Sequence, residues 1–298
     1  RCFGTSDFDA VIDYSGYGSF YSILLLSAKN AKKLIWQHND LLTDKNKIVN
    51  HKKPHSRELR VVFSTYQFYD KIVGCSEATM KVNLEKIGYS ELKDKCCFVR
   101  NAANFERVIN GSKESYTAES ANEAGFPDLL NKDLISFVNM GRLSPEKNQA
   151  ALIKAFAKAY DANKNLRLYI IGDGALMGEL KGLVHSLNLD GKVILTGNLD
   201  NPFMLMKDCS CFILPSLHEG QPVSLLEARL LKLPIIMSNF SSAASSLFGN
   251  GQLVIGNSVD DIYNGLIAFI NNEVPTCEFE YADYNNITIK QFEDIINE

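Results

Sequence analysis

Residues 134–148, LISFVNMGRLSPEKN, decide how the chain is expected to fold. The apolar run Leu134–Asn139 has the length and composition of a buried strand, and a glycine marks the turn that ends it. Ser144 suits the N-cap, and Pro145 the first turn, of a helix that extends to Tyr160. A buried strand that runs directly into a helix is typical of parallel sheets with crossover helices.

The same alternation of short apolar runs and helical patterns continues along the chain. The later part predicts six strands, at Leu134–Asn139, Leu166–Ile171, Val193–Leu195, Cys209–Leu214, Pro234–Met237 and Gln252–Ile255. Further helices are expected between these strands, near Leu176–Leu187, Pro202–Lys207, Pro222–Leu231 and Val259–Asn271. The earlier part gives a weaker pattern, with strands at Ala10–Asp13, Lys33–Gln37, Lys71–Cys75 and Cys97–Val99 and a helix at Ser76–Ile87. We therefore expect an α/β protein with two doubly wound, Rossmann-like domains.

Residues 110–122 are rich in Ser, Glu, Ala and Asn, with few large apolar side chains. Such a segment cannot anchor a core, so we expect it to run over the surface between the domains. The predicted domains are then 1–122 and 123–278, followed by a C-terminal helix within 279–298 that returns to the first domain. The chain begins at Arg1 without a methionine or a secretion signal. We interpret this start as a truncation that leaves the first domain incomplete.

Composition excludes some classes of function. The chain has 46% hydrophobic residues and a net charge of −4, and its apolar runs are far shorter than the roughly 20 residues of a membrane helix. The acidic total, without interleaved aromatic and basic residues, argues against a nucleic-acid partner. Seven cysteines without metal-like spacing are typical of reduced, buried side chains and favour a cytoplasmic location.

The charge is unevenly distributed. Residues 1–100 contain 16 Lys and Arg against 11 Asp and Glu, and much of this excess lies in one segment that includes Lys52, Lys53 and Arg57. The segment fits a solvated loop. It also fits a surface that docks an anionic lipid or a phosphate-bearing acceptor, with peripheral contact at the inner face of a membrane.

Two turns after predicted strands contain residues that suit a phosphate ligand. Arg142 precedes the predicted helix and Lys147 lies in its first turn, where free N–H groups favour anions. The two cations would then form a diphosphate site, although both also fit exposed charges on a well-capped helix. In the second turn, Gly172 and Gly174 permit a tight turn and a close approach to a ligand, but such pairs also occur in structural turns.

A third segment, residues 215–228, reads PSLHEGQPVSLLEA and follows a strand at the edge where open sheets bind ligands. Gly220 lets the backbone turn beneath a sugar or phosphate, and the carboxylates of Glu219 and Glu227 can accept hydrogen bonds from vicinal hydroxyls. A single glutamate on a helix is normally a solvated surface residue. Two at this spacing, flanked by Gly and Pro, favour binding.

In their order and spacing, GRLSPEKN, GDG, LTGNLDNP and PSLHEGQPVSLLEA resemble glycosyltransferase family 4, or glycosyl transferases group 1, a retaining family with the GT-B fold. The similarity is close over Leu134–Ile270. Looser similarity includes Ile35–Asn39, Val73–Glu77 and Val99–Asn101. The resemblance implies two Rossmann-like domains that face a cleft, with a nucleotide-diphosphate sugar held by the second domain and an acceptor bound by the first.

The resemblance also implies roles for individual residues. Arg142 and Lys147 would hold the diphosphate and stabilise the charge on the leaving group. Glu219, with the backbone of Gly220, would hold the donor sugar, and Glu227 would bind the ribose hydroxyls. The other donor-binding positions would be Gly141, Gly172, Gly174, Asn198, His218, Gln221, Pro222 and Val223.

His38 would lie at the cleft near the transferred sugar, although a lone histidine is also explained by a structural role. The resemblance implies retention by front-face attack, in which the departing phosphate takes the acceptor proton. No cofactor is expected, and the donor substrate would be a nucleotide sugar, with a UDP-sugar favoured. Metal dependence is not expected either, because the one D-x-D, Asp7-Phe8-Asp9, precedes a strand. The acceptor would be a glycan, or a lipid-linked or phosphate-bearing molecule, of the cell envelope.

Two other functions stay open. One is a different GT-B-like activity, such as a nucleotide-sugar epimerase or a polyol-phosphate transferase. The other is a non-catalytic partner that keeps the fold and supports an active transferase. The joint presence of Arg142, Lys147, Glu219 and Glu227 argues against the second, because a scaffold has no need for all four.

Overall fold

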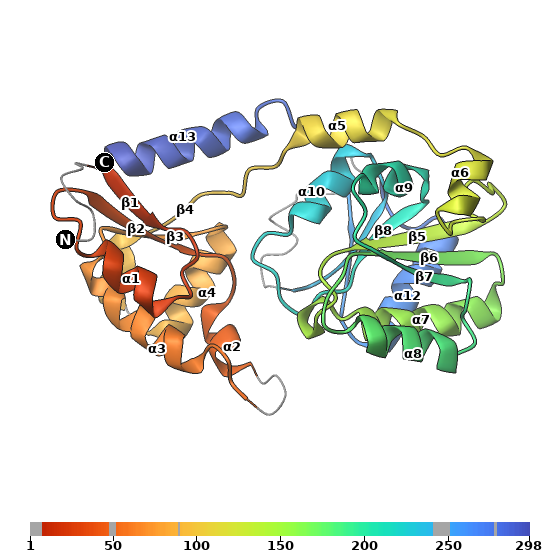
Figure 1. The fold of residues 1–298 in the computed structure, drawn as a ribbon, viewed down its shortest axis with the longest axis horizontal. Coiled ribbons are helices and arrows are strands. Elements are labelled where there is room, and N and C mark those ends of the chain that lie inside the picture. The colour runs from red at the N-terminus through yellow and green to blue at the C-terminus, as the bar shows by residue number, and fades with distance from the viewer. Residues whose placement is uncertain (1–7, 48–51, 89, 241–250, 277–278) are drawn as a thin grey trace. The chain divides into compact units, whose positions relative to one another are not determined.

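The chain forms two compact units. The computed structural model describes residues 8–47, 52–88, 90–240, 251–276 and 279–298 (Figure 1). The first unit comprises Arg1–Ala102, Glu219–Gln221 and Ala282–Glu298, and the second comprises Ala103–His218 and Pro222–Tyr281. Each unit is a parallel sheet covered by helices, so the predicted α/β class with two Rossmann-like domains is confirmed.

The second unit is built on a six-stranded parallel sheet in the order β10-β9-β8-β5-β6-β7. Its strands are β5 Ile135–Met140, β6 Leu166–Ile171, β7 Val193–Gly197, β8 Cys211–Leu214, β9 Ile235–Ser238 and β10 Leu253–Ile255. All six predicted strands are present, with ends that move by at most two residues. The direction in which successive strands are added reverses between β5 and β8.

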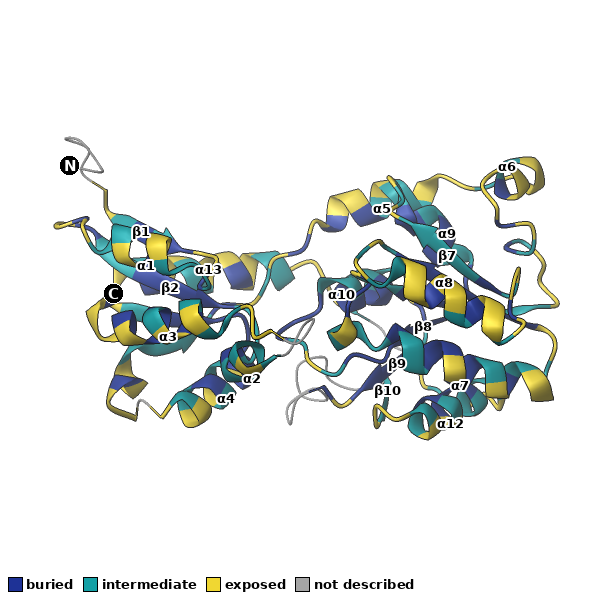
Figure 2. Cartoon of the chain, turned by 60° about the horizontal axis from the view of Figure 1, so that its bottom comes forward, coloured by how far each residue is buried: buried dark blue, intermediate teal, exposed yellow. Residues whose placement is uncertain are grey.

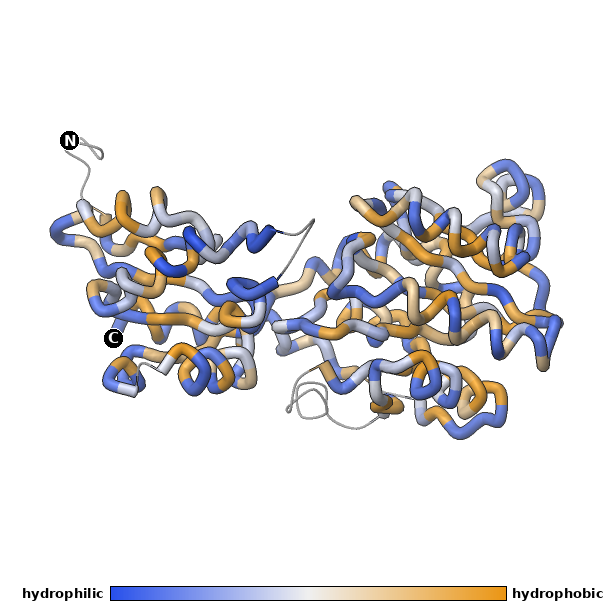
Figure 3. Tube along the Cα trace, turned by 90° about the horizontal axis from the view of Figure 1, so that it is seen from below, coloured by the Kyte–Doolittle hydropathy of each residue, from blue (hydrophilic) through white to orange (hydrophobic). Residues whose placement is uncertain are grey.

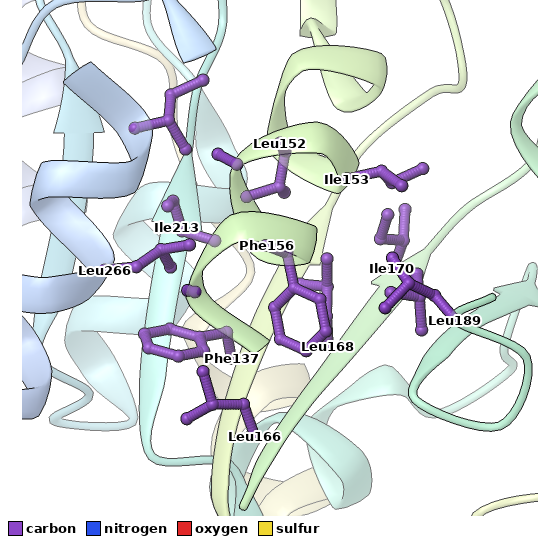
Figure 4. Close-up of a cluster of buried hydrophobic side chains, with 14 of the residues drawn as sticks. Phe137, Leu152, Ile153, Phe156, Leu166, Leu168, Ile170, Leu189, Ile213 and Leu266 are labelled. Atoms are coloured by element: carbon purple, nitrogen blue, oxygen red, sulfur yellow. The ribbon is translucent and has the colours of Figure 1, made fainter. Parts of the chain in front are cut away.

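Helices cover both faces of this sheet (Figure 1). One face carries α7 Gln149–Ala162, α8 Met177–Ser186 and α12 Val259–Ile270, and the other carries α5 Phe105–Lys113, α9 Pro202–Asp208 and α10 Val223–Leu230. On the first face, Leu152 and Phe156 of α7 are fully buried against Phe137 and Leu168 of the sheet (Figure 4). Their spacing of four residues places both on one side of the helix, and each such burial contributes about 2 kcal/mol.

The first unit has four described strands, all parallel, in the order β1-β2-β3-β4. They are β1 Ala10–Asp13, β2 Lys32–Gln37, β3 Lys71–Gly74 and β4 Cys96–Phe98. Its helices are α1 Ser19–Leu25, α2 Leu41–Asn46, α3 Ser56–Thr65, α4 Glu77–Ile87 and α13 Tyr284–Asn297, with 3-10 turns η1 Tyr66–Phe68 and η2 Ser90–Lys95. The sequence predicted all four strands and α4, but it gave no prediction for α1, α2 and α3.

Apolar side chains form a core on each face of this sheet, and the central strands are buried (Figure 2). On one face, Leu59 and Val62 of α3 pack with Ile35 of β2. On the other, Ile295 of α13 packs with Leu34 and Trp36. Hydrophobic stretches run through the interior elements and hydrophilic residues gather in the turns (Figure 3). Through the contacts of Ile295, the C-terminal helix α13 covers the second face of the sheet in the first unit.

The division between the units differs from the predicted boundary at residue 122. It lies between Ala102 and Ala103, because α5 belongs to the second unit. Asn201 donates from Nδ2 to the Gly111 carbonyl at 2.9 Å, and Gly111 leaves no room for a Cβ beside this side chain. The segment expected to run over the surface is indeed mostly exposed, and it contains the end of α5 and the short helix α6 Ala118–Glu123. A capping box between Thr117 and Ser120 begins α6 and satisfies its first free amides.

The helix predicted to begin at Pro145 is interrupted. Pro145–Lys147 form a 3-10 turn, η3, and α7 begins only at Gln149. Between them, Asn148 has a φ of 58°, in the left-handed region that asparagine tolerates better than most residues. Its Nδ2 donates to the Pro215 carbonyl at 3.1 Å. Lys147 therefore precedes α7 instead of lying in its first turn.

Candidate functional site

A hollow of about 430 Å³ opens at the carboxyl ends of the strands of the second unit. This volume lies within the range of small-molecule sites. One side of the hollow is lined by residues that follow β5, β6 and β7, namely Gly141, Arg142, Gly172 and Asn198. The other side is lined by two helical residues, Arg107 of α5 and Glu227 of α10. The hollow adjoins the reversal of strand order between β5 and β8, the kind of place where open sheets bind ligands, because its loops follow β5, β6 and β7 and Glu227 lies on α10, the helix after β8.

Backbone hydrogen bonds join the three strand-end loops that form this side of the hollow. The Gly141 amide donates to the Ile171 carbonyl at 3.0 Å, and the Leu143 amide donates to the Asp173 carbonyl at 2.9 Å. The Gly172 amide donates to the Gly197 carbonyl at 2.9 Å. The loops after β5, β6 and β7 thus form one connected layer of backbone.

The glycines after β6 have two different functions. Gly172 lines the hollow and has a φ of 131°, a conformation that other residues rarely adopt, and an added Cβ would overlap the Gly141 carbonyl oxygen. Gly174 is absent from the lining. An added Cβ there would overlap the Leu143 carbonyl, so this glycine allows two loops to pack closely. The expected contact of Gly174 with a nucleotide stays a prediction.

The two predicted cations both belong to the segment between β5 and α7, and only Arg142 is in the lining of the hollow. Arg142 is exposed and lines the hollow. Lys147 lies over Gly141, and its Cε atom is 3.6 Å from the position that a Cβ on Gly141 would take. The turn that contains Lys147 is held in place, because the Leu217 amide donates to the Glu146 carbonyl at 2.8 Å.

Glu227, on α10, is half-buried and lines the hollow opposite these loops. Burial raises the pKa of the Glu227 carboxyl above its ordinary value, whereas the charge of Arg107 acts on this pKa in the opposite direction. Arg107, on α5, lines the same hollow and was not among the residues predicted from the sequence. A single arginine on a helix outside the predicted donor domain carries no motif, and only the packing of α5 against α10 reveals it.

Three predicted site residues in the loop before α10, Glu219, Gly220 and Gln221, pack with the first unit. The Gly220 carbonyl accepts a hydrogen bond from Ser76 Oγ at 3.2 Å. Gln221 is buried, its Oε1 accepts from the Asn101 amide at 2.5 Å, and its Nε2 donates to Tyr284 Oη at 2.6 Å. Both polar ends of the Gln221 side chain are thus engaged within the first unit.

His38 follows β2 in the first unit. Its Nε2 lies 2.6 Å from the Tyr14 carbonyl, and the two rings meet edge-on with centroids 4.7 Å apart. Because a carbonyl can only accept, this contact places the proton on Nε2. The roles expected of His38 and Glu219 in catalysis stay predictions.

The remaining predicted positions lie outside the lining of the hollow. His218 is exposed, Pro222 occupies the N-cap position of α10, and Val223 is the first residue of that helix. On the first unit, the basic side chains expected to contact an acceptor or membrane are exposed, namely Lys52, Lys53 and Arg57.

For metals and membranes, the described ranges permit two limited statements. They contain no group of three or more His, Cys, Asp or Glu side chains arranged to hold a metal ion, and Asp7 of the D-x-D lies outside the described residues. Within the same ranges, every helix is too short or too polar to cross a bilayer.

Comparison with known proteins gives one consistent family. The family model described as glycosyl transferases group 1 matches residues 122–286. An uncharacterized glycosyltransferase of Methanocaldococcus jannaschii is 28% identical over 259 residues, which cover 87% of this chain and 60% of that protein. The N-acetylgalactosamine-N,N'-diacetylbacillosaminyl-diphospho-undecaprenol 4-alpha-N-acetylgalactosaminyltransferase of Campylobacter jejuni is 30% identical over 198 residues, which cover 65% of this chain and 50% of that protein. The chain thus spans 50% and 60% of the lengths of these relatives.

Solved structures share the fold. The crystal structure of Anabaena HepE in complex with UDP-glucose has a TM-score of 0.71 and 18% sequence identity, and the match covers 94% of this chain and 76% of that one. At this identity the likeness concerns the fold alone. Together with the two parallel-sheet units, it confirms the predicted GT-B class.

Proposed function

Because the chain belongs to the glycosyl transferases group 1 family, we propose that it moves a hexose from a nucleotide-diphosphate sugar, in the first instance a UDP-sugar, to an acceptor hydroxyl. The observation that carries this proposal is the hollow at the strand reversal of the second unit. Arg142 offers a cation for a diphosphate, and Glu227 offers a carboxylate for a vicinal diol. Gly172 lets the ligand approach the backbone closely.

The proposed reaction retains the anomeric configuration. The bond between the anomeric carbon and the phosphate oxygen breaks, and the acceptor oxygen bonds to the same carbon on the same face. The proton of the acceptor hydroxyl passes to the departing phosphate oxygen. Arg142 and Lys147 stabilise the negative charge that develops on the diphosphate, which is an electrostatic role of large effect. We propose a metal-independent reaction, because these two cations supply the charge.

The proposed acceptor is a lipid-linked or phosphate-bearing glycan in the synthesis of cell-envelope polysaccharide, teichoic acid or glycolipid. The name of the Campylobacter jejuni relative, which includes a diphospho-undecaprenol-linked saccharide, supports this class. We place the activity in the cytoplasm at the inner face of the membrane, and the five unpaired cysteines among the described residues suit that compartment.

Exposed Lys52, Lys53 and Arg57 would supply the contact with an anionic surface. Replacing all three by glutamine is then expected to weaken binding to anionic vesicles at low salt. Unchanged binding would leave the segment as a solvated loop.

Incubation with labelled UDP-, GDP- and CDP-sugars tests the proposed function. A transferase is expected to bind one donor class and to release free sugar slowly in the absence of an acceptor, with retained configuration. The variant Glu227→Gln should lose donor affinity, while Lys154→Ala, an exposed lysine on α7, should keep it. Interconversion of two nucleotide sugars would indicate an epimerase instead, and the absence of donor binding would indicate a non-catalytic partner.

A further inference from the structure

We propose that Arg107 is a positioning residue of the hollow, whose positive charge on the same wall supports the Glu227 carboxylate as an acceptor of hydrogen bonds from the ribose diol of the donor. This inference rests on the proposed function. Arg107 lies on α5 and Glu227 on α10, two helices that pack together on the same face of the second sheet (Figure 1). Both side chains line the hollow.

The guanidinium of Arg107 makes two contacts in the structure, one with a backbone carbonyl and one with an aromatic ring. Its Nη2 donates to the Asp200 carbonyl at 3.2 Å, and its Cζ lies 5.6 Å from the centre of the Phe203 ring. The helix that carries it is anchored in turn, because Lys207 Nζ donates to the Ser112 carbonyl at 2.8 Å. Part of the conformational entropy of this arginine is therefore lost before a nucleotide arrives, which favours a supporting role.

Among the charges around Glu227, that of Arg107 is the main positive charge that acts on the pKa of its carboxyl. Burial disfavours the ionised carboxylate and raises its pKa, and the Arg107 charge opposes this effect. Arg229, on the same helix, is buried and lies over the Phe279 ring at 5.2 Å. The strands that pack against α10, β8 and β9, carry no ionisable acid or base apart from the Cys211 thiol. Across the hollow lie Arg142 and Asp173, which have opposite charges.

The charge state of Glu227 determines what the residue can bind. A carboxylate accepts hydrogen bonds through both oxygens, so it matches two neighbouring hydroxyls, and charge-assisted bonds of this kind are about twice as strong as neutral ones. A protonated carboxyl presents a donor to one of these hydroxyls and loses the match. Arg107 would therefore support ribose binding without touching the nucleotide.

Titration of the Glu227 carboxyl tests this pair directly and without a nucleotide. In ¹³C-labelled protein, with the signal assigned from Glu227→Gln, the pKa of the carboxyl is expected to rise by about one unit in Arg107→Ala. Arg107→Lys should restore most of the wild-type value. Lys113→Ala, which removes an exposed cation from the same helix, should leave it unchanged. An unchanged pKa in Arg107→Ala would overturn the proposal.

Calorimetry with UDP tests the consequence for binding. Near pH 6, Arg107→Ala is expected to weaken UDP binding up to about tenfold, with the affinity of the variant falling at a higher pH than that of the wild type. In a Glu227→Gln background the same change should have no further effect. An equal loss in both backgrounds would overturn the proposal, because Arg107 would then act on the nucleotide itself. If wild-type protein binds no UDP, the proposed donor is contradicted. The carboxyl titration would still show whether Arg107 acts on Glu227.

Discussion

The two sheets differ in the order of their strands. In the second unit the order reverses between β5 and β8, and the hollow lies at that reversal. The four described strands of the first unit run in simple order, without a reversal. At a reversal, the loops of adjacent strands turn toward opposite faces and leave a crevice between them. Without one, successive loops turn the same way.

This difference separates two uses of polar residues. Beside the reversal, Arg142 and Glu227 face open space that a ligand can fill. In the first unit, Gln221 satisfies its polar atoms internally, through Asn101 and Tyr284. Strand order thus agrees with the proposed placement of the donor in the second unit.

The largest expected effect concerns the core beneath the hollow. Phe156→Ala should lower the free energy of unfolding by about 3–5 kcal/mol, because it leaves a cavity at a fully buried position. UDP binding should weaken as the second unit loosens. Leu59→Ala, at an equally buried position of the first unit, should cost about 2–5 kcal/mol and leave UDP affinity unchanged. Chemical denaturation measures the free energy of unfolding of each variant, and calorimetry measures its UDP affinity. Equal losses of UDP affinity in the two variants would contradict the assignment of UDP binding to the second unit.

The next effect concerns Lys147. Lys147→Ala is expected to lower kcat/KM about a hundredfold or more with the fold intact, because a cation that acts on the leaving group contributes mainly in the transition state. Circular dichroism and initial rates check this. Lys154→Ala serves as the matched control on the following helix. Activity near wild type would remove Lys147 from the mechanism.

A smaller effect is expected at Gly172. Gly172→Ala should cost about 1–3 kcal/mol, because its φ of 131° strains other residues and the new Cβ would press on the Gly141 carbonyl. Gly182→Ala, in the open on α8, should instead stabilise the protein by about 0.5–1 kcal/mol. Thermal unfolding with and without UDP measures both changes. Similar behaviour of the two variants would contradict the tight contact between the loops.

The smallest effect is a gain in stability at Glu227. Because burial raises the pKa of this carboxyl in the folded state, its ionisation disfavours folding as the pH rises through that pKa. Glu227→Gln should therefore slightly stabilise the protein above this pH and have little effect below the pKa of the unfolded chain, while UDP affinity falls. Unfolding curves at pH 3 and pH 7 check the sign. A loss of stability at pH 7 would contradict it.

Much of the second unit was accessible from sequence because its signals are local. The strand before Gly141, the glycine at Gly172 and the position of Glu227 all follow from short patterns, and the structure brings these residues to one hollow. The break at Asn148 was missed, because asparagine tolerates the left-handed region but its presence alone does not require that conformation. Arg107 was missed because its importance depends on packing between α5 and α10.

The first unit was harder to predict, since its elements are short and depend on distant partners. α1 has exposed Phe20 and Tyr21 beside buried Ser22, so its sequence lacks a helical stripe of apolar residues. The engagement of Gln221 with Tyr284 joins residues 63 positions apart, which no local pattern reveals.

The packing of Ile295 against Leu34 and Trp36 has a consequence for protein synthesis. Lys32 also donates from Nζ to the Ile295 carbonyl at 2.7 Å, across 263 positions of the chain. A ribosome makes the four described strands of the first unit before it makes α13, so one face of their sheet lacks its cover until residues 284–297 have been made. The second unit is made between these strands and α13, so it can fold before the first unit is complete. Until α13 is made, the sheet of the first unit has apolar side chains uncovered on one face. Translation that stops before residue 282 would leave that face uncovered.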